Sequence, residues 1–240
     1  MNKMKQKLED LNKKFREARP EEVLGFVLKE HPGKAAFSTS LGSEDQVLTD
    51  MIAKIDKGIK IFTLDTGRQF YETYDTLDKT NGKYDINIEI LFPDAQEVEI
   101  MVKEKGINLF YDSIENRRFC CNLRKLKPLK RALKGYEVWI TGIRREQSVT
   151  RKNVELFEWD EELQIVKISP IINWSEKEVW NYIRAHKVPY NILHDKGYPS
   201  IGCAPCTRAV EKGENSRNGR WWWENSDTKE CGIHLHVKTS

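Results

Sequence analysis

The chain has 240 residues, 39% of them hydrophobic and 32% charged, with a formal net charge of +3. This length suits one globular α/β domain with a real core, and the charge is too small for a general nucleic-acid binder. No run reaches the roughly 18 apolar residues of a membrane span, and the N-terminal stretch lacks a signal-peptide pattern, so we expect a cytoplasmic protein. Thiols stay reduced there, so the five cysteines are interpreted as metal ligands or reactive thiols before disulfides.

Apolar periodicity and turn residues predict the elements along the chain. Two helices come first, and strands then alternate with helices. In chain order we expect helices over 4–18 and 20–28, a strand over 34–40, a helix over 44–55, a strand over 59–65, a helix over 69–80, a strand over 86–92, helices over 95–105 and 122–133, and a strand over 137–142. A hairpin over 154–169 follows, and then a helix that Ser175 and Glu178 start with a capping box.

This alternation predicts an α/β fold: a single domain with a mainly parallel twisted sheet flanked by helices. Periodicity stops near residue 190, although the stretch 194–240 carries three cysteines, three of the five histidines and three consecutive tryptophans. Such a loop-rich segment is usually functional. We therefore expect N-terminal helices over 1–33, a nucleotide-binding α/β part over 34–190, and a functional C-terminal part over 191–240 that ends in a flexible arm.

Four of the five cysteines come in two pairs. Cys120 and Cys121 are adjacent, whereas Cys203 and Cys206 form a C-x-x-C. Adjacent side chains normally point apart, so both can be ligands only where the backbone bends or the acceptor is larger than one ion. This favours a 4Fe–4S cluster over a single zinc ion. The alternative, two buried helix cysteines and a thioredoxin-like redox pair, leaves the adjacent pair unexplained.

Cys231 stands alone near the C-terminus. Lys229 and His234 would lower the pKa of its thiol, whereas Glu230 opposes them. A thiolate is a nucleophile, so Cys231 is a candidate for covalent catalysis. The alternative is an unreactive surface cysteine.

The turn after the first predicted strand carries Ser38, Ser40 and Gly42. Its backbone N–H groups and hydroxyls would face a phosphate at a helix N-terminus. It looks like the PP-loop of ATP pyrophosphatases, usually S-G-G-x-D-S, but Leu41 replaces one glycine. That change argues against ATP cleavage and suits a monophosphate-sized group, and a plain polar turn is the alternative. Arg144 also follows a strand, and we expect it to reach the nucleotide.

Several segments between about Ala36 and His234, taken together, resemble the adenylyl-sulfate reductases of assimilatory sulfate reduction, the iron–sulfur branch of the phosphosulfate reductase family. The segments appear in the family's order. They are STSLGSEDQV, LDTGRQFYETY, CCNLRKLKPL, TGIRREQSVTR, HDKGYPSIGCAPCTRAV, RNGRWWWE and ECGIH.

The resemblance implies a PP-loop-like (adenine nucleotide α hydrolase-like) domain, and a 4Fe–4S cluster held by the four paired cysteines Cys120, Cys121, Cys203 and Cys206. It implies that Cys231 attacks the sulfur of adenylyl sulfate and forms a thiosulfonate, from which thioredoxin or glutaredoxin releases sulfite. Family members specific for the phosphorylated substrate lack the cluster cysteines. This favours adenylyl sulfate and leaves 3′-phosphoadenylyl sulfate as an alternative or additional substrate.

The same resemblance assigns the remaining substrate contacts. Leu64 and Thr66 lie where the family contacts adenosine, although Asp65 between them is equally suited to capping the next helix. The positions that hold the phosphosulfate are Lys125, Arg217 and Arg220, and His234 would bind the sulfate or activate the thiol. Lys125 follows Cys121 by one helical turn, so it could lie between cluster and substrate.

Further expectations concern the C-terminal part and the surface. We expect the segment with Cys231 to close for attack and to open for reduction. Tryptophans 221–223 would pin this segment or pack it over the site, and a simple core anchor is an equal alternative. Arg151 and Lys152 are expected on a solvated face, and a homo-oligomer is possible by analogy.

Two other classes of function remain open from the residues. A zinc-stabilised nucleic-acid binder would use the same four cysteines and would not need Cys231. A PP-loop ligase or thiolase acting on RNA would need ATP turnover, which the altered loop argues against.

Overall fold

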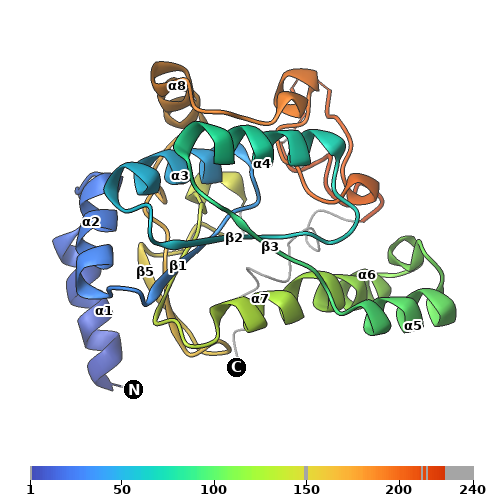
Figure 1. The fold of residues 1–240 in the computed structure, drawn as a ribbon, viewed down its shortest axis with the longest axis horizontal. Helices are drawn as coiled ribbons and strands as arrows, with labels where there is room; N and C mark the ends of the chain where they lie inside the picture. Colours follow the sequence, from blue (N-terminus) through green and yellow to red (C-terminus); the bar gives the residue numbers. More distant parts are fainter. Residues whose placement is uncertain (1, 149–150, 212, 215, 225–240) are drawn as a thin grey trace. The chain divides into compact units, whose positions relative to one another are not determined.

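A computed structural model describes residues 2–148, 151–211, 213–214 and 216–224. Its strands form one six-stranded sheet in the order β3-β2-β1-β4-β6-β5 (Figure 1). β1 pairs in parallel with β2 and β4, β4 pairs in parallel with β6, and β5 pairs antiparallel with β6. The bounds are β1 Ala35–Ser38, β2 Lys60–Leu64, β3 Glu89–Leu91, β4 Val138–Ile140, β5 Phe157–Asp160 and β6 Ile165–Ile168. The predicted mainly parallel α/β sheet and the hairpin are therefore confirmed.

The described residues group into two compact units. The first, here called the sheet unit, lies within Met1–Thr63, Glu72–Glu89 and Leu133–Asn191. The second, the cysteine unit, lies within Leu64–Tyr71, Ile90–Ala132 and Ile192–Ser240. The three-part division expected from the sequence stays a prediction.

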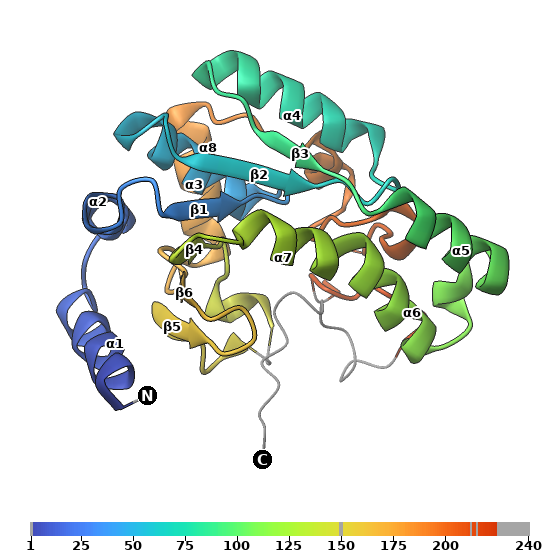
Figure 2. The ribbon, with the colours of Figure 1, turned by 60° about the horizontal axis from the view of Figure 1, so that its bottom comes forward.

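The helices of the sheet unit bury one continuous apolar core. They are α1 Asn2–Lys14, α2 Pro20–Glu30, α3 Ser43–Ile55, α4 Tyr71–Tyr84 and α8 Glu176–His186. α3 and α8 pack together (Figure 2), and the buried Gln46 amide donates to Thr80 Oγ1 on α4 and to the Pro189 carbonyl, 2.7 Å each. Asp50 accepts hydrogen bonds from Tyr84 at 2.9 Å and from Tyr182 at 2.7 Å, so one buried carboxylate joins α3, α4 and α8.

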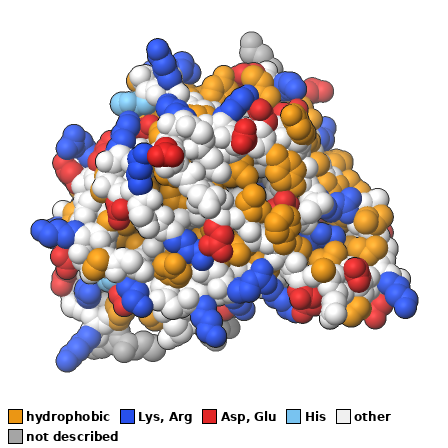
Figure 3. Space-filling model, viewed as in Figure 1, with side chains coloured by type: hydrophobic (Ala, Val, Ile, Leu, Met, Phe, Trp, Pro, Cys, Tyr) orange, Lys and Arg blue, Asp and Glu red, His pale blue; other side chains and the backbone are white. Residues whose placement is uncertain are grey.

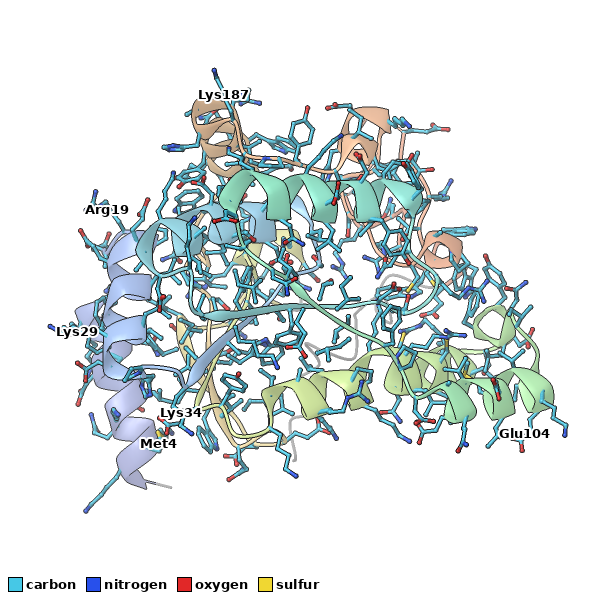
Figure 4. The ribbon with its side chains drawn as sticks, in the orientation of Figure 1. Met4, Arg19, Lys29, Lys34, Glu104 and Lys187 are labelled. Carbon is cyan, nitrogen blue, oxygen red and sulfur yellow. The ribbon has the colours of Figure 1, made fainter. Side chains whose placement is uncertain are left out.

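Helix ends follow local chemistry. Pro20 is the first residue of α2, and the Arg19 N–H and guanidinium donate to Glu22. Figure 4 shows Arg19 at the start of α2 and Lys29 near its end. The predicted capping box of Ser175 and Glu178 starts α8 as expected.

α1 covers the edge strand of the sheet. The Asn12 side-chain amide donates to the Phe157 carbonyl and accepts from the Phe157 N–H, 2.9 Å each. One amide side chain thus satisfies both backbone groups of one residue of β5. Such pairing protects an exposed edge from another strand.

Helices of the cysteine unit differ from the sequence expectation in one place. They are α5 Ala95–Lys105, α6 Ile114–Cys121 and α7 Lys127–Leu133, with a π-helical turn, Asn122–Leu126, between α6 and α7. The helix predicted over 122–133 therefore begins too late. α6 starts after Ser113, whose hydroxyl accepts the Asn116 N–H at 3.1 Å, and the polar run after it hides the helical period.

Lysine and arginine side chains are dispersed among acidic ones on the face drawn in Figure 3. This distribution is in keeping with the small net charge. Among the helices that the structure describes, none combines the length and the apolar character needed to cross a membrane.

Candidate active site

The loop between β1 and α3 carries three of the predicted substrate residues. The Ser38 hydroxyl accepts the Trp139 indole N–H at 2.7 Å. Ser40 donates both its backbone N–H and its hydroxyl to Asp45, 2.6 Å each, and Gly42 precedes the first residue of α3. Leu41, which replaces the PP-loop glycine, has φ +60° and is buried. The loop therefore keeps a left-handed turn without glycine, and Asp45 holds it closed.

Asp45 lies in a tight buried position. A Cβ added to Gly142, in the segment after β4, would fall 2.1 Å from Asp45 Oδ1, so only glycine leaves room for this carboxylate. Burial raises the pKa of Asp45 to about 6, and the negative charge of Glu44 adds to this effect. The hydrogen bonds from Ser40 and the positive charge of Arg151 lower the pKa but do not outweigh burial. Sequence reasoning did not single out Asp45, although it occupies the end of the S-x-G-x-x-D pattern.

The raised pKa gives a prediction for stability. Native Asp45 holds its proton up to about pH 6, whereas an unfolded aspartate loses it near 3.8, so the group stabilises the fold at low pH. That contribution falls by up to about 3 kcal/mol as pH rises from 4 to 6. In Asp45→Asn this fall should be absent, whereas the exposed Asp78→Asn should behave as wild type. Urea unfolding between pH 4 and 7.5 measures the free energy of unfolding as a function of pH. If this free energy changes with pH equally in wild type and Asp45→Asn, Asp45 does not have the raised pKa.

Arg144 supports the same loop. Its Nε and Nη2 donate to Glu44 Oε1 at 2.9 and 2.8 Å, and its Nη1 donates to the Trp174 carbonyl at 3.3 Å. Although burial opposes it, the charge and hydrogen bonds of Arg144 keep the pKa of Glu44 below its usual value. The nucleotide contact expected of Arg144 stays a prediction, because in this structure the guanidinium braces the first turn of α3.

Arg151 was expected on a solvated face, and that expectation is wrong. Its side chain is buried, lies within reach of the Asp45 charge and donates to Gln147. A basic pair in a polar loop looks solvated in sequence, because the Asp45 carboxylate that Arg151 lies near is more than a hundred residues away along the chain. Lys152 is exposed as expected.

The paired cysteines gather in the cysteine unit. Cys120, Cys203 and Cys206 belong to one apolar cluster with Leu123 and Trp221, and Cys121 is the last residue of α6. None of the four is in a disulfide. The helix expected over 122–133 would put the adjacent pair at its start, and this is wrong, because the pair ends α6. A π-helical turn starts at the next residue, and such turns are frequent at functional sites.

The surroundings of these cysteines are cationic. Burial by itself would raise the pKa of the Cys203 thiol. The charges of Lys125 and Arg220 and the Thr66 hydroxyl, 3.3 Å from the sulfur, outweigh burial and lower this pKa. Burial and the neighbouring Cys203 raise the pKa of Cys206 to about 12. Deprotonating several of these thiols together is therefore unfavourable unless a metal centre compensates the charge.

The donor set fits an iron–sulfur cluster. Within the described residues, no group of three His, Cys, Asp or Glu side chains is spaced to hold a metal ion. The observations that fit the cluster are the shared apolar cluster of Cys120, Cys203 and Cys206 and the cationic side chains around it. The buried Nε atoms of Arg124 and Arg220 have no hydrogen-bond partner among the described residues. Arg124 Nη1 donates to the Thr66 carbonyl at 2.6 Å, which holds that guanidinium beside Cys120.

The predicted phosphosulfate residues share this unit. The charge of Lys125 acts on Cys120, Cys203 and Cys206. Arg217 and Arg220 lie over the Trp221 ring, 5.9 and 4.6 Å from its centroid. Trp221 is buried and so is a core anchor, whereas Trp222 is exposed.

The turn after β2 supplies the other predicted contacts of this unit. The Leu64 carbonyl accepts from the Gln69 side chain at 3.3 Å. Asp65 does not cap α4: its carboxylate accepts the Gly67 N–H at 2.7 Å within the turn. The structure therefore places Leu64 and Thr66 in the same unit as Lys125, while Ser38, Ser40, Gly42 and Arg144 lie in the sheet unit.

Gly202 gives a second prediction. A Cβ there would fall 2.2 Å from Arg220 Nη2, whose guanidinium also bonds to the Ile201 carbonyl. Gly202→Ala should displace Arg220 and weaken sulfonucleotide binding roughly tenfold, by analogy with the loss of one charge-assisted hydrogen bond. Gly213→Ala, in open space, is the control, although its positive φ makes it slightly strained. Equal substrate dissociation constants for Gly202→Ala and wild type by calorimetry would contradict the role of Arg220.

Two predicted residues, Cys231 and His234, lie outside the described residues, so their roles stay predictions. Sequence reasoning also missed Arg117 and Glu224, which pair across 107 positions. No local signal would have found that pair.

Known proteins resemble this chain over most of its length. Residues 34–209 match the phosphoadenosine phosphosulfate reductase domain. The adenosine 5'-phosphosulfate reductase of Allochromatium vinosum is 51% identical over 219 residues, covering 91% of this chain and 85% of that protein. The enzyme of the same name from Burkholderia cepacia is 48% identical over 210 residues, covering 88% of this chain and 84% of that protein.

Solved structures agree. The phosphoadenylyl-sulfate reductase from Candida auris, in a phosphate complex, has a TM-score of 0.73 at 32% identity and covers 85% of this chain and 96% of its own. The NH3-dependent NAD synthetase from Campylobacter jejuni, at 8% identity and a TM-score of 0.52, covers 80% of this chain and 78% of its own and shares the fold alone. The altered PP-loop, the gathered cysteines and these matches lead to one conclusion: the chain belongs to the phosphoadenosine phosphosulfate reductase family.

Proposed function

We propose that this protein reduces adenylyl sulfate to sulfite and AMP in sulfate assimilation, and that it is an oxidoreductase of the cytoplasm. The observation that carries the proposal is the gathering of Cys120, Cys203 and Cys206 with Lys125 in one unit of a chain about half identical to adenosine 5'-phosphosulfate reductases. Four cysteines in that arrangement suit the iron–sulfur form of the enzyme.

The Cys231 thiolate attacks the sulfur of the bound sulfonucleotide. A sulfur–sulfur bond forms, the bond from sulfur to the bridging phosphate oxygen breaks, and AMP leaves with the electron pair. Lys125, Arg217 and Arg220 would stabilise the charge that develops on the leaving oxygen. Arg suits this task because its planar fork donates two hydrogen bonds to one oxyanion. His234 would bind the sulfate or assist the thiol.

The second half needs an external dithiol, such as thioredoxin or glutaredoxin. One of its thiolates attacks Cys231 sulfur, sulfite leaves, and a mixed disulfide forms. The second thiol of the dithiol then releases the Cys231 thiol. The balance is adenylyl sulfate plus two thiols giving AMP, sulfite and one disulfide.

Cys120, Cys121, Cys203 and Cys206 would hold the 4Fe–4S cluster. The cluster would supply a fixed local charge and would link α6 to the Cys203–Cys206 segment. Its thiolates would compensate the charge of the guanidiniums of Arg124 and Arg220, whose buried Nε atoms have no hydrogen-bond partner among the described residues. The charge of Lys125 acts on Cys120, Cys203 and Cys206 and would also stabilise the substrate oxyanions.

Activity on 3′-phosphoadenylyl sulfate is the second candidate, because the matched family model and the Candida auris structure carry that substrate's name. The experiment is to incubate the purified protein with each sulfonucleotide without reductant and to measure the mass of the protein by mass spectrometry. An increase of one SO3 on Cys231 with adenylyl sulfate supports the proposal. An adduct only with the phosphorylated substrate reassigns the substrate, and no adduct with either overturns the function.

A further inference from the structure

The cysteine unit contains an ion pair, Arg117 with Glu224, that is almost completely buried. Arg117 Nε and Nη2 donate to the two carboxylate oxygens of Glu224, at 2.5 and 2.9 Å. The side chains are 2% and 3% exposed. The guanidinium and the carboxylate therefore form two parallel hydrogen bonds, and this bidentate geometry is the strongest for such a pair.

Burying two charges is costly, and a well-packed apolar pair would often be as stable. Fold stability alone therefore does not explain an ion pair at this position. The places of the two residues along the chain indicate another role. Arg117 is on α6, one turn before the adjacent cysteines, and Glu224 precedes Cys231 by seven residues.

The same guanidinium contacts more than Glu224. Burial opposes its charge, but Glu224 and then Cys121 raise the pKa of Arg117. It also lies 4.7 Å from the centroid of the Trp221 ring. Trp221 has φ +42°, a strained conformation for a bulky residue, which persists only where its surroundings hold it. Its N–H donates to the Cys206 carbonyl at 3.1 Å, and the Glu224 N–H donates to the Trp221 carbonyl at 2.9 Å.

We propose that Arg117 and Glu224 are positioning residues that fasten the base of the Cys231 segment to the helix carrying Cys120 and Cys121. The inference rests on the proposed function, since it takes Cys231 as the nucleophile. It adds to that function the element that keeps the nucleophile within reach of the substrate.

The length of the tether gives the size of the effect. Cys231 follows Glu224 by seven residues, so a fixed Glu224 keeps it within about 25 Å. If that hold is lost together with the Trp221 turn, the next fixed residue is Arg220, which is paired with Thr207, and Cys231 follows it by 11 residues. Effective concentration falls roughly as the −3/2 power of tether length, which gives a decrease of about twofold.

The test compares Glu224→Gln and Arg117→Lys with wild type. The controls make the same changes at exposed neighbours, Glu211→Gln and Arg118→Lys. At saturating adenylyl sulfate without reductant, the single-turnover rate of adduct formation per iron-loaded protein should fall about twofold in the two variants. The substrate concentration that gives half of the maximal rate should stay at the wild-type value, because no substrate contact is removed.

Hydrogen–deuterium exchange supplies a readout that does not depend on activity. The amides of Trp221 and Glu224 should exchange faster in Glu224→Gln and Arg117→Lys, and at the wild-type rate in the controls. If Glu224→Gln does not fold, Glu224→Asp keeps the charge, withdraws it by one methylene, and should show the same pattern with a smaller decrease.

Wild-type adduct rates and exchange in these variants would overturn the inference while the function stands, because the wild-type protein still forms the adduct. An equal loss in the control variants would overturn it as well. If wild type forms no adduct on Cys231, the proposed function falls and the inference falls with it.

Discussion

Cys231→Ser is expected to form no sulfite adduct and to lose at least about 10³-fold in turnover with thioredoxin and adenylyl sulfate. A serine hydroxyl is almost fully protonated at neutral pH, whereas a thiol is a few per cent thiolate before any activation. Without the sulfur nucleophile there is no thiosulfonate, and the external dithiol has nothing to reduce. Intact-mass measurement after incubation with substrate reads the first effect, and sulfite release reads the second.

Two measurements isolate the loss of the nucleophile. Iron content and substrate affinity of Cys231→Ser should equal those of wild type, because Cys231 is not among the four proposed ligands and serine replaces only its sulfur with oxygen. An adduct that persists in Cys231→Ser would move the nucleophile to another cysteine and reject the mechanism. A protein that loses iron would instead place Cys231 among the ligands.

Cys206→Ser is expected to have the largest effect on stability. The side chain is buried in the apolar cluster with Cys120 and Trp221. A bound metal centre contributes its binding free energy to folding, so loss of one ligand should destabilise the protein by about 3 kcal/mol or more. For a chain of this length that is a decrease in Tm of roughly 6–12 °C. Calorimetry measures the Tm, and metal and sulfide analysis measure the cluster.

The colour of the purified protein separates the classes of site. Brown wild-type protein with iron and sulfide near equal amounts, and pale Cys206→Ser with little of either, support the cluster. Colourless wild-type protein with one zinc ion would favour the nucleic-acid-binding alternative. Full iron in Cys206→Ser would remove this residue from the ligand set, and Cys231→Ser is the matched control for replacing one thiol.

Much of the fold follows from local patterns. The strands β1, β2 and β4, the hairpin of β5 and β6, and the capped start of α8 lie where apolar periodicity and capping residues place them. These signals span a few residues, so one sequence carries them. α6 is the exception, because its residues are mostly polar and its one strong signal is the Ser113 cap.

The candidate site divides in the same way. Cysteine spacing indicated a metal centre larger than one ion and a bend beside the adjacent pair, and a π-helical turn follows Cys121. The spacing did not indicate Arg124, whose guanidinium reaches Thr66 across 58 positions. Likewise, the sequence of the loop after β1 did not indicate that the N–H and the hydroxyl of Ser40 both donate to Asp45.

The sequence by itself determined the fold class, the family and the division of five cysteines into two pairs and one single residue, because periodicity, caps and motif spacing are properties of neighbouring residues. Only the tertiary structure decided that Arg151 is buried, that Asp45 closes the loop after β1, and that Arg117 holds Glu224. The physical reason is that the cost of burying a charge depends on surroundings that the fold brings together. Asp45 is enclosed by Gly142, Arg151 lies near Asp45, and Arg117 meets Glu224, each about a hundred residues away along the chain.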